Sequence, residues 1–122
     1  MAKISSPEPF YSLSRRAGDL LYLSGFGPVE NGELVAGDIQ EQTIFTMDAM
    51  VKVLESEGAT FDDVVRVNVF LLDMADRDRF NSTYMTYFKN KERMPTRRLV
   101  GAGDMFKRIL VEIDAIAYLG KD

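Results

Sequence analysis

The sequence predicts a single α+β domain over residues 1–122, in which a sheet has two helices packed on one face. Three observations lead to this class. Short β-branched and aromatic segments alternate with two segments of helical periodicity. Apolar residues make up 46% of the chain and charged residues 28%, which is ordinary globular composition. A chain of 122 residues is also sufficient for one hydrophobic core. The expected order of elements is β-β-β-α-β-α-β-β.

The first third of the chain is expected to form a β-meander. The apolar and aromatic segment Asp19–Ser24 precedes Gly25-Phe26-Gly27-Pro28, which is typical of a strand that enters a tight loop. Within Val29–Val35, Asn31-Gly32 lies between two short segments and is the strongest local signal for a hairpin.

The first helix is expected to begin at Asp38 and to end at Gly58. Asp38 can serve as the N-cap, Gln42 lies near the capping-box position, and a glycine is a common helix terminator. The apolar residues recur at roughly helical spacing: Ile39, Phe45, Met47, Met50, Val51 and Leu54. This pattern predicts an amphipathic helix of about five turns.

The segment Val64–Leu72 predicts the next strand. It is β-branched and apolar at each odd position from 65 to 71, so Arg66 and Asn68 share the other face. That face would meet either solvent or a site.

A second helix and two strands complete the expected order. Asp76 can cap a helix whose aromatic residues are Phe80, Tyr84, Tyr87 and Phe88. The Met94-Pro95 step prevents any continuation of that helix. Thr96–Val100 and Ile109–Tyr118 are the last expected strands, separated by a loop at Gly101–Gly103.

One face of the sheet should be left without a cover. Right-handed crossovers into one sheet place their helices on the same side, so both helices are expected there. Apolar residues on both faces of Val64–Leu72 then favour burial of the opposite face. We therefore expect a closed homo-oligomer.

Composition disfavours several classes of function. Cysteine and histidine are absent, which removes disulfides, thiolate catalysis and the commonest zinc ligand. A net charge of −4 disfavours nucleic acid as a partner. No apolar segment is long enough for a signal peptide or a membrane span, so a cytoplasmic protein is expected. Acid–base chemistry would require a carboxylate, a tyrosine, a lysine or bound water.

Two polar pairs are candidates for chemistry. Arg97 and Arg98 open a strand, so they point to opposite faces and only one can share a given pocket. A guanidinium there would bind a carboxylate bidentately. Glu112 and Asp114 lie on one strand face and could position a water or shuttle protons. On spacing alone, the favoured interpretations are a surface arginine or an intersubunit ion pair for the first pair, and a solvated polar face for the second.

Two further polar side chains are weaker candidates. Tyr11 could donate a hydroxyl to a substrate, although an aromatic residue at a strand start usually packs. Ser24 has no histidine partner and is expected to bind rather than attack. Gly25-Phe26-Gly27 is too short for a phosphate-binding fingerprint and is expected to form a loop.

Seven segments in order form a recognisable pattern. They are Tyr11-Ser12, Leu23-Ser24-Gly25 with Pro28, Asn31–Thr43, Asp62–Val65, Phe80–Tyr84, Pro95-Thr96-Arg97 and Val111–Ala117. Together these segments resemble the RidA/YjgF family of reactive-intermediate deaminases, and the resemblance extends over nearly the entire chain.

The resemblance implies a chorismate-mutase-like fold assembled as a homotrimer, with the open sheet faces forming a central barrel and three clefts between subunits. It also implies hydrolysis of 2-imino or enamine acids to 2-keto acids and ammonia, without metal or organic cofactor. By the same resemblance, Arg97 pairs with the substrate carboxylate and Glu112 is associated with the hydrolytic water. Tyr11, Ser24 and Asn81 match pocket residues.

Three positions depart from the family pattern. Arg98 replaces a small hydroxylic residue, Phe26 replaces a glutamine, and a glycine is missing before Pro9-Phe10-Tyr11. Phe26 would make the pocket more aromatic, and Arg98 could form a structural ion pair or bind a second carboxylate. A larger enamine substrate and a non-catalytic ligand-binding or chaperone-like trimer are therefore alternatives. Ribonuclease activity is disfavoured by the negative charge and the absence of histidine.

Overall fold

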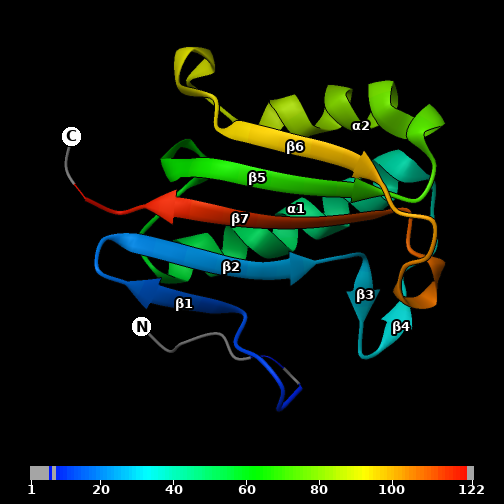
Figure 1. Ribbon diagram of the computed structural model, residues 1–122, viewed down its shortest axis with the longest axis horizontal. Helices are drawn as coiled ribbons and strands as arrows, with labels where there is room; N and C mark the ends of the chain where they lie inside the picture. Colours follow the sequence, from blue (N-terminus) through cyan, green and yellow to red (C-terminus); the bar gives the residue numbers. More distant parts are fainter. Residues whose placement is uncertain (1–5, 7, 121–122) are drawn as a thin grey trace.

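A five-stranded mixed sheet forms the centre of the computed structural model (Figure 1). The structure describes residue 6 and residues 8–120, so the expected domain limits at residues 1 and 122 lie outside the described residues. The strands are β1 (Ser14–Ala17), β2 (Leu20–Phe26), β5 (Val64–Leu71), β6 (Thr96–Gly101) and β7 (Val111–Tyr118). Their order is β1-β2-β7-β5-β6, in which only β5 and β6 are parallel neighbours.

Two α-helices, α1 (Ile39–Ser56) and α2 (Arg77–Tyr84), cover one face of this sheet (Figure 1). Helix α1 contacts β2, β7 and α2. The buried sides of both helices and the sheet form one core, which includes Met47, Met50, Leu54, Val67, Val69, Phe80 and Ile113. This architecture confirms the predicted α+β class. In the part of the chain that the structure describes, neither helix is long and apolar enough to cross a bilayer.

A reciprocal capping box begins helix α1. Asp38 Oδ1 accepts from the backbone N–H of Glu41 at 2.9 Å, and Glu41 Oε1 accepts from that of Asp38 at 3.2 Å. The expected partner, Gln42, is one residue too late for this role. Its buried side chain donates to Gly37 O and accepts from Leu110 N, and so joins α1 to the segment that leads into β7.

Helix α2 begins without the expected side-chain cap. Asp76 makes no capping hydrogen bond, because a 3-10 turn at Met74–Asp76 already leads directly into the helix. The cap lies at the start of that turn, where Asp73 Oδ1 accepts from Ala75 N at 2.9 Å. After α2, a further 3-10 turn at Met85–Tyr87 brings Phe88 back into the core.

The N-terminal third contains two hairpins rather than a meander. β1 was not predicted because its sequence, Ser-Arg-Arg-Ala, lies on an exposed sheet edge and shows no apolar alternation. β3 (Val29–Glu30) and β4 (Glu33–Leu34) form a separate two-stranded sheet. Their turn confirms the Asn-Gly signal, since Asn31 and Gly32 have φ angles of 54° and 80°.

A register shift modifies the expected alternation of β5. Its pairing with β7 is irregular between Val64 and Arg66, so Val64 is buried and Val65 is exposed. The expectation that Val65 faces the core is therefore wrong. From Arg66 onward the strand alternates regularly, and its partly exposed residues point to the face that the helices do not cover: Arg66, Asn68 and Phe70.

We call the face without helices the open face. It combines apolar residues with charged ones: Tyr22, Phe70, Ile116, Arg66, Arg98, Glu112 and Asp114. The homo-oligomer expected to bury this face remains a prediction.

Candidate functional site

The sheet separates the two adjacent arginines of β6. Arg97 lies opposite Val67, which is fully buried in the helix-covered core. Arg98 lies opposite Asn68, whose side chain is on the open face. Because paired positions of neighbouring strands share a face, Arg97 points toward α2 and Arg98 points away from it.

Neutral neighbours hold the Arg97 guanidinium at the edge of the sheet. Arg97 Nη1 donates to Asn81 Oδ1 at 2.8 Å. The guanidinium carbon lies 4.9 Å from the ring centroid of Tyr84 and 6.0 Å from that of Phe80, within the range of cation–π contact. A planar carboxylate could pair with the N–H donors that Asn81 does not use.

A small cavity opens in front of this guanidinium. Its volume is about 260 Å³, and its lining residues are Asn81, Tyr84, Met85, Met94, Pro95 and Arg97. We call it the arginine pocket. Burial raises the pKa of Tyr84 to about 12, although the nearby Arg97 opposes this shift. Tyr84 therefore remains a neutral stacking surface for Arg97 at physiological pH.

Glu112 lies on the open face, beside the end of β2. A Cβ added to Gly25 would be 3.1 Å from Glu112 Oε2, so the absence of a side chain at Gly25 makes room for this carboxylate. Burial, and to a lesser extent the neighbouring Asp114, raise the pKa of Glu112. Asp114 itself accepts from Asn68 Nδ2 at 2.8 Å. We call Ser24, Gly25, Glu112 and Asp114 the glutamate cluster.

Ser24 joins the segment that contains Tyr11 to this cluster. Ser24 Oγ donates to Ser12 O at 2.5 Å, and Ser24 N donates to Leu13 O at 2.9 Å. Because the Ser24 hydroxyl already donates its proton to Ser12 O, its oxygen can only accept a hydrogen bond from a ligand. Tyr11, one residue before Ser12, is exposed and has no comparable constraint.

Phe26 does not line either region. Its side chain is only 8% exposed and belongs to the core. A register shift between Leu23 and Phe26 explains this position, because strict alternation from Leu23 would have placed residue 25 in the core. The expectation that Phe26 makes the pocket more aromatic does not agree with the structure.

The arginine pocket and the glutamate cluster do not meet within one chain. β5 lies between β6 and β7, so Arg97 and Glu112 are two strand spacings apart, about 10 Å across the sheet. Val67 of β5 pairs with Arg97 on one side and with Ala115 on the other, so Arg97 is level with Ala115. Glu112 lies three residues from Ala115, which adds about 10 Å along β7. Their side chains also leave opposite faces. The prediction that they act on one substrate is therefore not met by a single chain.

Sequence reasoning did not predict four of the six lining residues of the arginine pocket as site residues: Tyr84, Met85, Met94 and Pro95. Tyr84 was predicted only as a helical aromatic, yet it lies three residues after Asn81 and so on the same helix face. Met85 and Met94 belong to irregular segments on either side of the 3-10 turn at Lys91–Arg93. No periodic pattern in those segments could have indicated their position.

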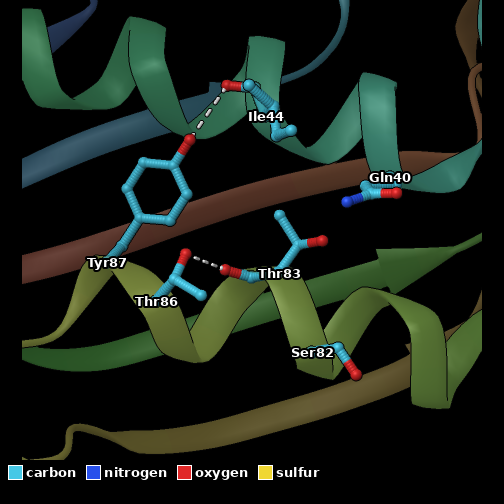
Figure 2. A pocket seen from close by; sticks show the side chains of 6 residues that line it. All are labelled: Gln40, Ile44, Ser82, Thr83, Thr86 and Tyr87. Carbon is cyan, nitrogen blue, oxygen red and sulfur yellow. Dashed lines mark hydrogen bonds between the residues drawn. The ribbon is translucent and has the colours of Figure 1, made fainter.

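A second hollow, of about 360 Å³, lies between the two helices (Figure 2). It is lined by Gln40, Ile44, Ser82, Thr83, Thr86 and Tyr87. Thr86 donates to Thr83 O, and the Tyr87 hydroxyl contacts Ile44 O (Figure 2). Burial, followed by Asp48, raises the pKa of Tyr87, so none of the lining residues is charged at neutral pH. The larger hollow therefore offers no counter-charge for an acid.

Among the described residues, no group of three or more acidic side chains is arranged to hold a metal ion. The small α+β domain thus has a guanidinium at a cavity on one sheet face and a carboxylate with a raised pKa on the other. A family profile described as Endoribonuclease L-PSP matches residues 3–119. The chain belongs to this family, which is the RidA/YjgF family that its sequence resembles.

Named relatives agree with this membership. A RutC family protein of Pyrococcus horikoshii is 37% identical over 118 residues, which cover 93% of this chain and 92% of the relative. A protein of Dermatophagoides farinae named 2-iminobutanoate/2-iminopropanoate deaminase is 32% identical over 118 residues, with 93% and 91% covered. The crystal structure of the Rid family protein YyfA from Yersinia pestis matches with a TM-score of 0.86 and 32% identity, over 93% and 90% of the two chains.

Proposed function

We propose that this protein hydrolyses 2-imino or enamine acids to 2-keto acids and ammonia without a cofactor. The observation on which this proposal rests is the Arg97 guanidinium, which Asn81 and Tyr84 orient in a pocket sized for a small carboxylate. The relative from Dermatophagoides farinae, named an imine deaminase, supports the same reaction class.

The chemistry needs few groups, because a protonated imine carbon is already electrophilic. Arg97 pairs with the substrate carboxylate and so fixes the position of that carbon. Glu112, whose raised pKa suits a proton acceptor, takes a proton from water as the water oxygen bonds to the carbon. Glu112 then returns this proton to the amine nitrogen of the resulting carbinolamine. As the C–N bond breaks and ammonia leaves, the C=O bond forms and the hydroxyl proton passes to the Glu112 carboxylate, from which ammonia or water removes it. The Ser24 oxygen, and the hydroxyl of Tyr11 one residue before Ser12, would supply further polar contacts to the substrate.

The site must combine two chains, because Arg97 and Glu112 lie on opposite faces of one sheet. A homotrimer whose subunits bury their open faces would bring the arginine pocket of one chain to the glutamate cluster of the next. The apolar residues of the open face, such as Tyr22 and Phe70, support such burial. The substrate would then bind in clefts between subunits.

Mixed oligomers test this arrangement directly. Arg97→Ala and Glu112→Gln chains are co-expressed with different tags, and hybrids carrying both tags are purified. Each variant alone should hydrolyse 2-iminopropanoate generated in situ at least about 100-fold more slowly than the wild type. Each purified hybrid trimer should have about one third of its sites restored, since a site needs an intact Arg97 from one chain and an intact Glu112 from its neighbour.

Two results would contradict the proposal. Hybrids that form but remain inactive would mean that Arg97 and Glu112 do not combine across chains. An Arg97→Ala protein with the wild-type rate would mean that no carboxylate anchor operates at this residue. A hybrid of wild-type chains with the two tags is the matched control for assembly and purification.

A non-catalytic carboxylate-binding protein is the second candidate. Arg97, Asn81 and Tyr84 belong to one chain, so this guanidinium could bind an acid whether or not Glu112 of another chain is correctly placed. This reading is supported if 2-keto acids bind with micromolar affinity while no imine is hydrolysed above background. It is refuted by turnover that Arg97→Ala abolishes.

A further inference from the structure

The arginine pocket has an apolar wall that the proposed reaction does not use. Apart from Arg97 and Asn81, its lining consists of the Tyr84 ring, Met85, Met94 and Pro95. Met85 is 49% exposed and Met94 is 38% exposed, so neither methionine is part of the core. Two long apolar side chains thus remain accessible in the lining of one small cavity.

The wall offers no second positive charge. Arg97 is the one cation among the lining residues of the pocket. Arg98, its neighbour in β6, points to the open face. Lys91 donates to the backbone carbonyls of Met85 and Phe88, which directs its ammonium to the end of the helical segment. A second carboxylate on the substrate would therefore be desolvated against thioethers without a partner in this pocket.

The dimensions and the side chains of the pocket favour a short, flexible occupant. Its volume of about 260 Å³ is below the range of roughly 300–1,000 Å³ that suits drug-sized ligands. Methionine is unbranched and adjusts its shape to irregular apolar partners. A linear alkyl or thioether chain could therefore lie along Met85 and Met94 while its carboxylate meets Arg97.

We propose that Met85 and Met94 are specificity-determining residues, which make the site selective for monocarboxylic acids with unbranched apolar side chains. This inference rests on the proposed function for the reaction, but it concerns binding and can be tested without turnover. It excludes dicarboxylic imino acids as preferred substrates and assigns Arg98 no role in this pocket.

The test uses stable 2-oxo acids, whose carbonyl group stands in for the imine. Dissociation constants are measured for the series 2-oxopropanoate, 2-oxobutanoate, 2-oxopentanoate and 2-oxohexanoate, and for the dicarboxylate 2-oxopentanedioate. Affinity should increase about two- to fourfold with each methylene, since each buries apolar surface against the methionines. The dicarboxylate should bind at least about tenfold more weakly than 2-oxopentanoate.

Methionine-to-glutamine variants localise the effect, because glutamine has a similar length and a polar end. Met85→Gln and Met94→Gln should each reduce the gain in affinity per methylene from 2-oxopropanoate to 2-oxohexanoate. Met74→Gln is the matched control, since Met74 is similarly exposed at 45% and lies outside the pocket. It should retain the full dependence on chain length. Met85→Arg should strengthen binding of 2-oxopentanedioate by about tenfold.

The outcomes separate this inference from the proposed function. If the affinities require Arg97 but do not depend on chain length, Met85 and Met94 do not determine specificity, whereas Arg97 still binds the carboxylate. A dependence that persists in both Met85→Gln and Met94→Gln would also overturn this inference. Binding that is unchanged in Arg97→Ala would instead contradict the proposed function, because the acids would then occupy another place.

Discussion

The arginine pocket and the glutamate cluster lie on opposite faces of the same sheet, and they differ in how far one chain completes them. Arg97 is surrounded by Asn81, Tyr84 and a defined cavity, all from its own chain. Glu112 lies on a face that no helix covers, beside Gly25 and Asp114. In the proposed function, recognition of a carboxylate would need the residues of one chain, whereas hydrolysis would need two neighbouring chains.

The arginine pocket and the glutamate cluster also differ in their electrostatic surroundings. Arg97 is held by a neutral amide and a neutral ring, so its positive charge is not compensated by an acidic neighbour. Glu112 lies near another carboxylate and is half-buried, so protonation of its carboxylate is favoured. One region is therefore suited to hold an anion and the other to accept a proton.

The largest expected effect separates the two arginines of β6. Arg97→Ala should lower kcat/KM for 2-iminopropanoate about 100- to 1,000-fold, because a bidentate, charge-assisted pair is lost. Arg97→Lys should recover only part of this loss, since an ammonium cannot reproduce the fork. Arg98→Ala should lower kcat/KM by a factor at least about ten times smaller than Arg97→Ala does, because the Arg98 side chain is on the other face. Equal losses for the two alanine variants would show that the faces do not have separate roles.

Replacing the proton acceptor should affect turnover and not binding. Glu112→Gln should reduce kcat about 100-fold, which is typical for loss of a general base. Affinity for 2-oxobutanoate should change less than about threefold, because Arg97 remains in place. Single-turnover rates and calorimetric titrations of the same preparations check the two halves of this prediction. A large loss of affinity would mean that Glu112 contacts the acid itself.

The pH dependence tests the surroundings of Glu112. Activity should fall on acidification as Glu112 takes up a proton, with a midpoint above the ordinary glutamate pKa of about 4.3. Asp114→Asn should move this midpoint to lower pH, because a neighbouring negative charge is removed. The midpoint should remain above the ordinary value, since burial is the larger cause. Rates corrected for uncatalysed hydrolysis at each pH provide the measurement, and a shift to higher pH would refute the assignment.

The smallest expected effect comes from the space beside Glu112. Gly25→Ala would place a Cβ 3.1 Å from Glu112 Oε2 and displace the carboxylate by a few tenths of an ångström. We expect kcat to fall about two- to tenfold, with unchanged 2-oxobutanoate affinity. Gly103→Ala is the matched control, because no atom lies within 4 Å of its added Cβ. Equal kcat values for both variants would mean that the position of Glu112 is not critical.

Several predictions from the sequence were correct because they depend on local rules. The Asn31-Gly32 hairpin follows from two residues that tolerate positive φ, and Asp38 caps α1 through hydrogen bonds within one turn. The alternation of strand residues placed Arg97 and Arg98 on opposite faces before any fold was known. The capping-box partner of Asp38 was predicted one residue too late, at Gln42 instead of Glu41, and this error concerns only the first turn of α1.

The sequence by itself therefore determined the α+β class, the main elements and the separation of the two arginines, because these depend on periodicity and short-range hydrogen bonds. Only the tertiary structure decided that Arg97 faces α2, that Phe26 lies in the core, and that Met85 and Met94 meet at one pocket. Strand register and bulges set these positions. They result from pairing between residues far apart in the chain, which no local pattern records.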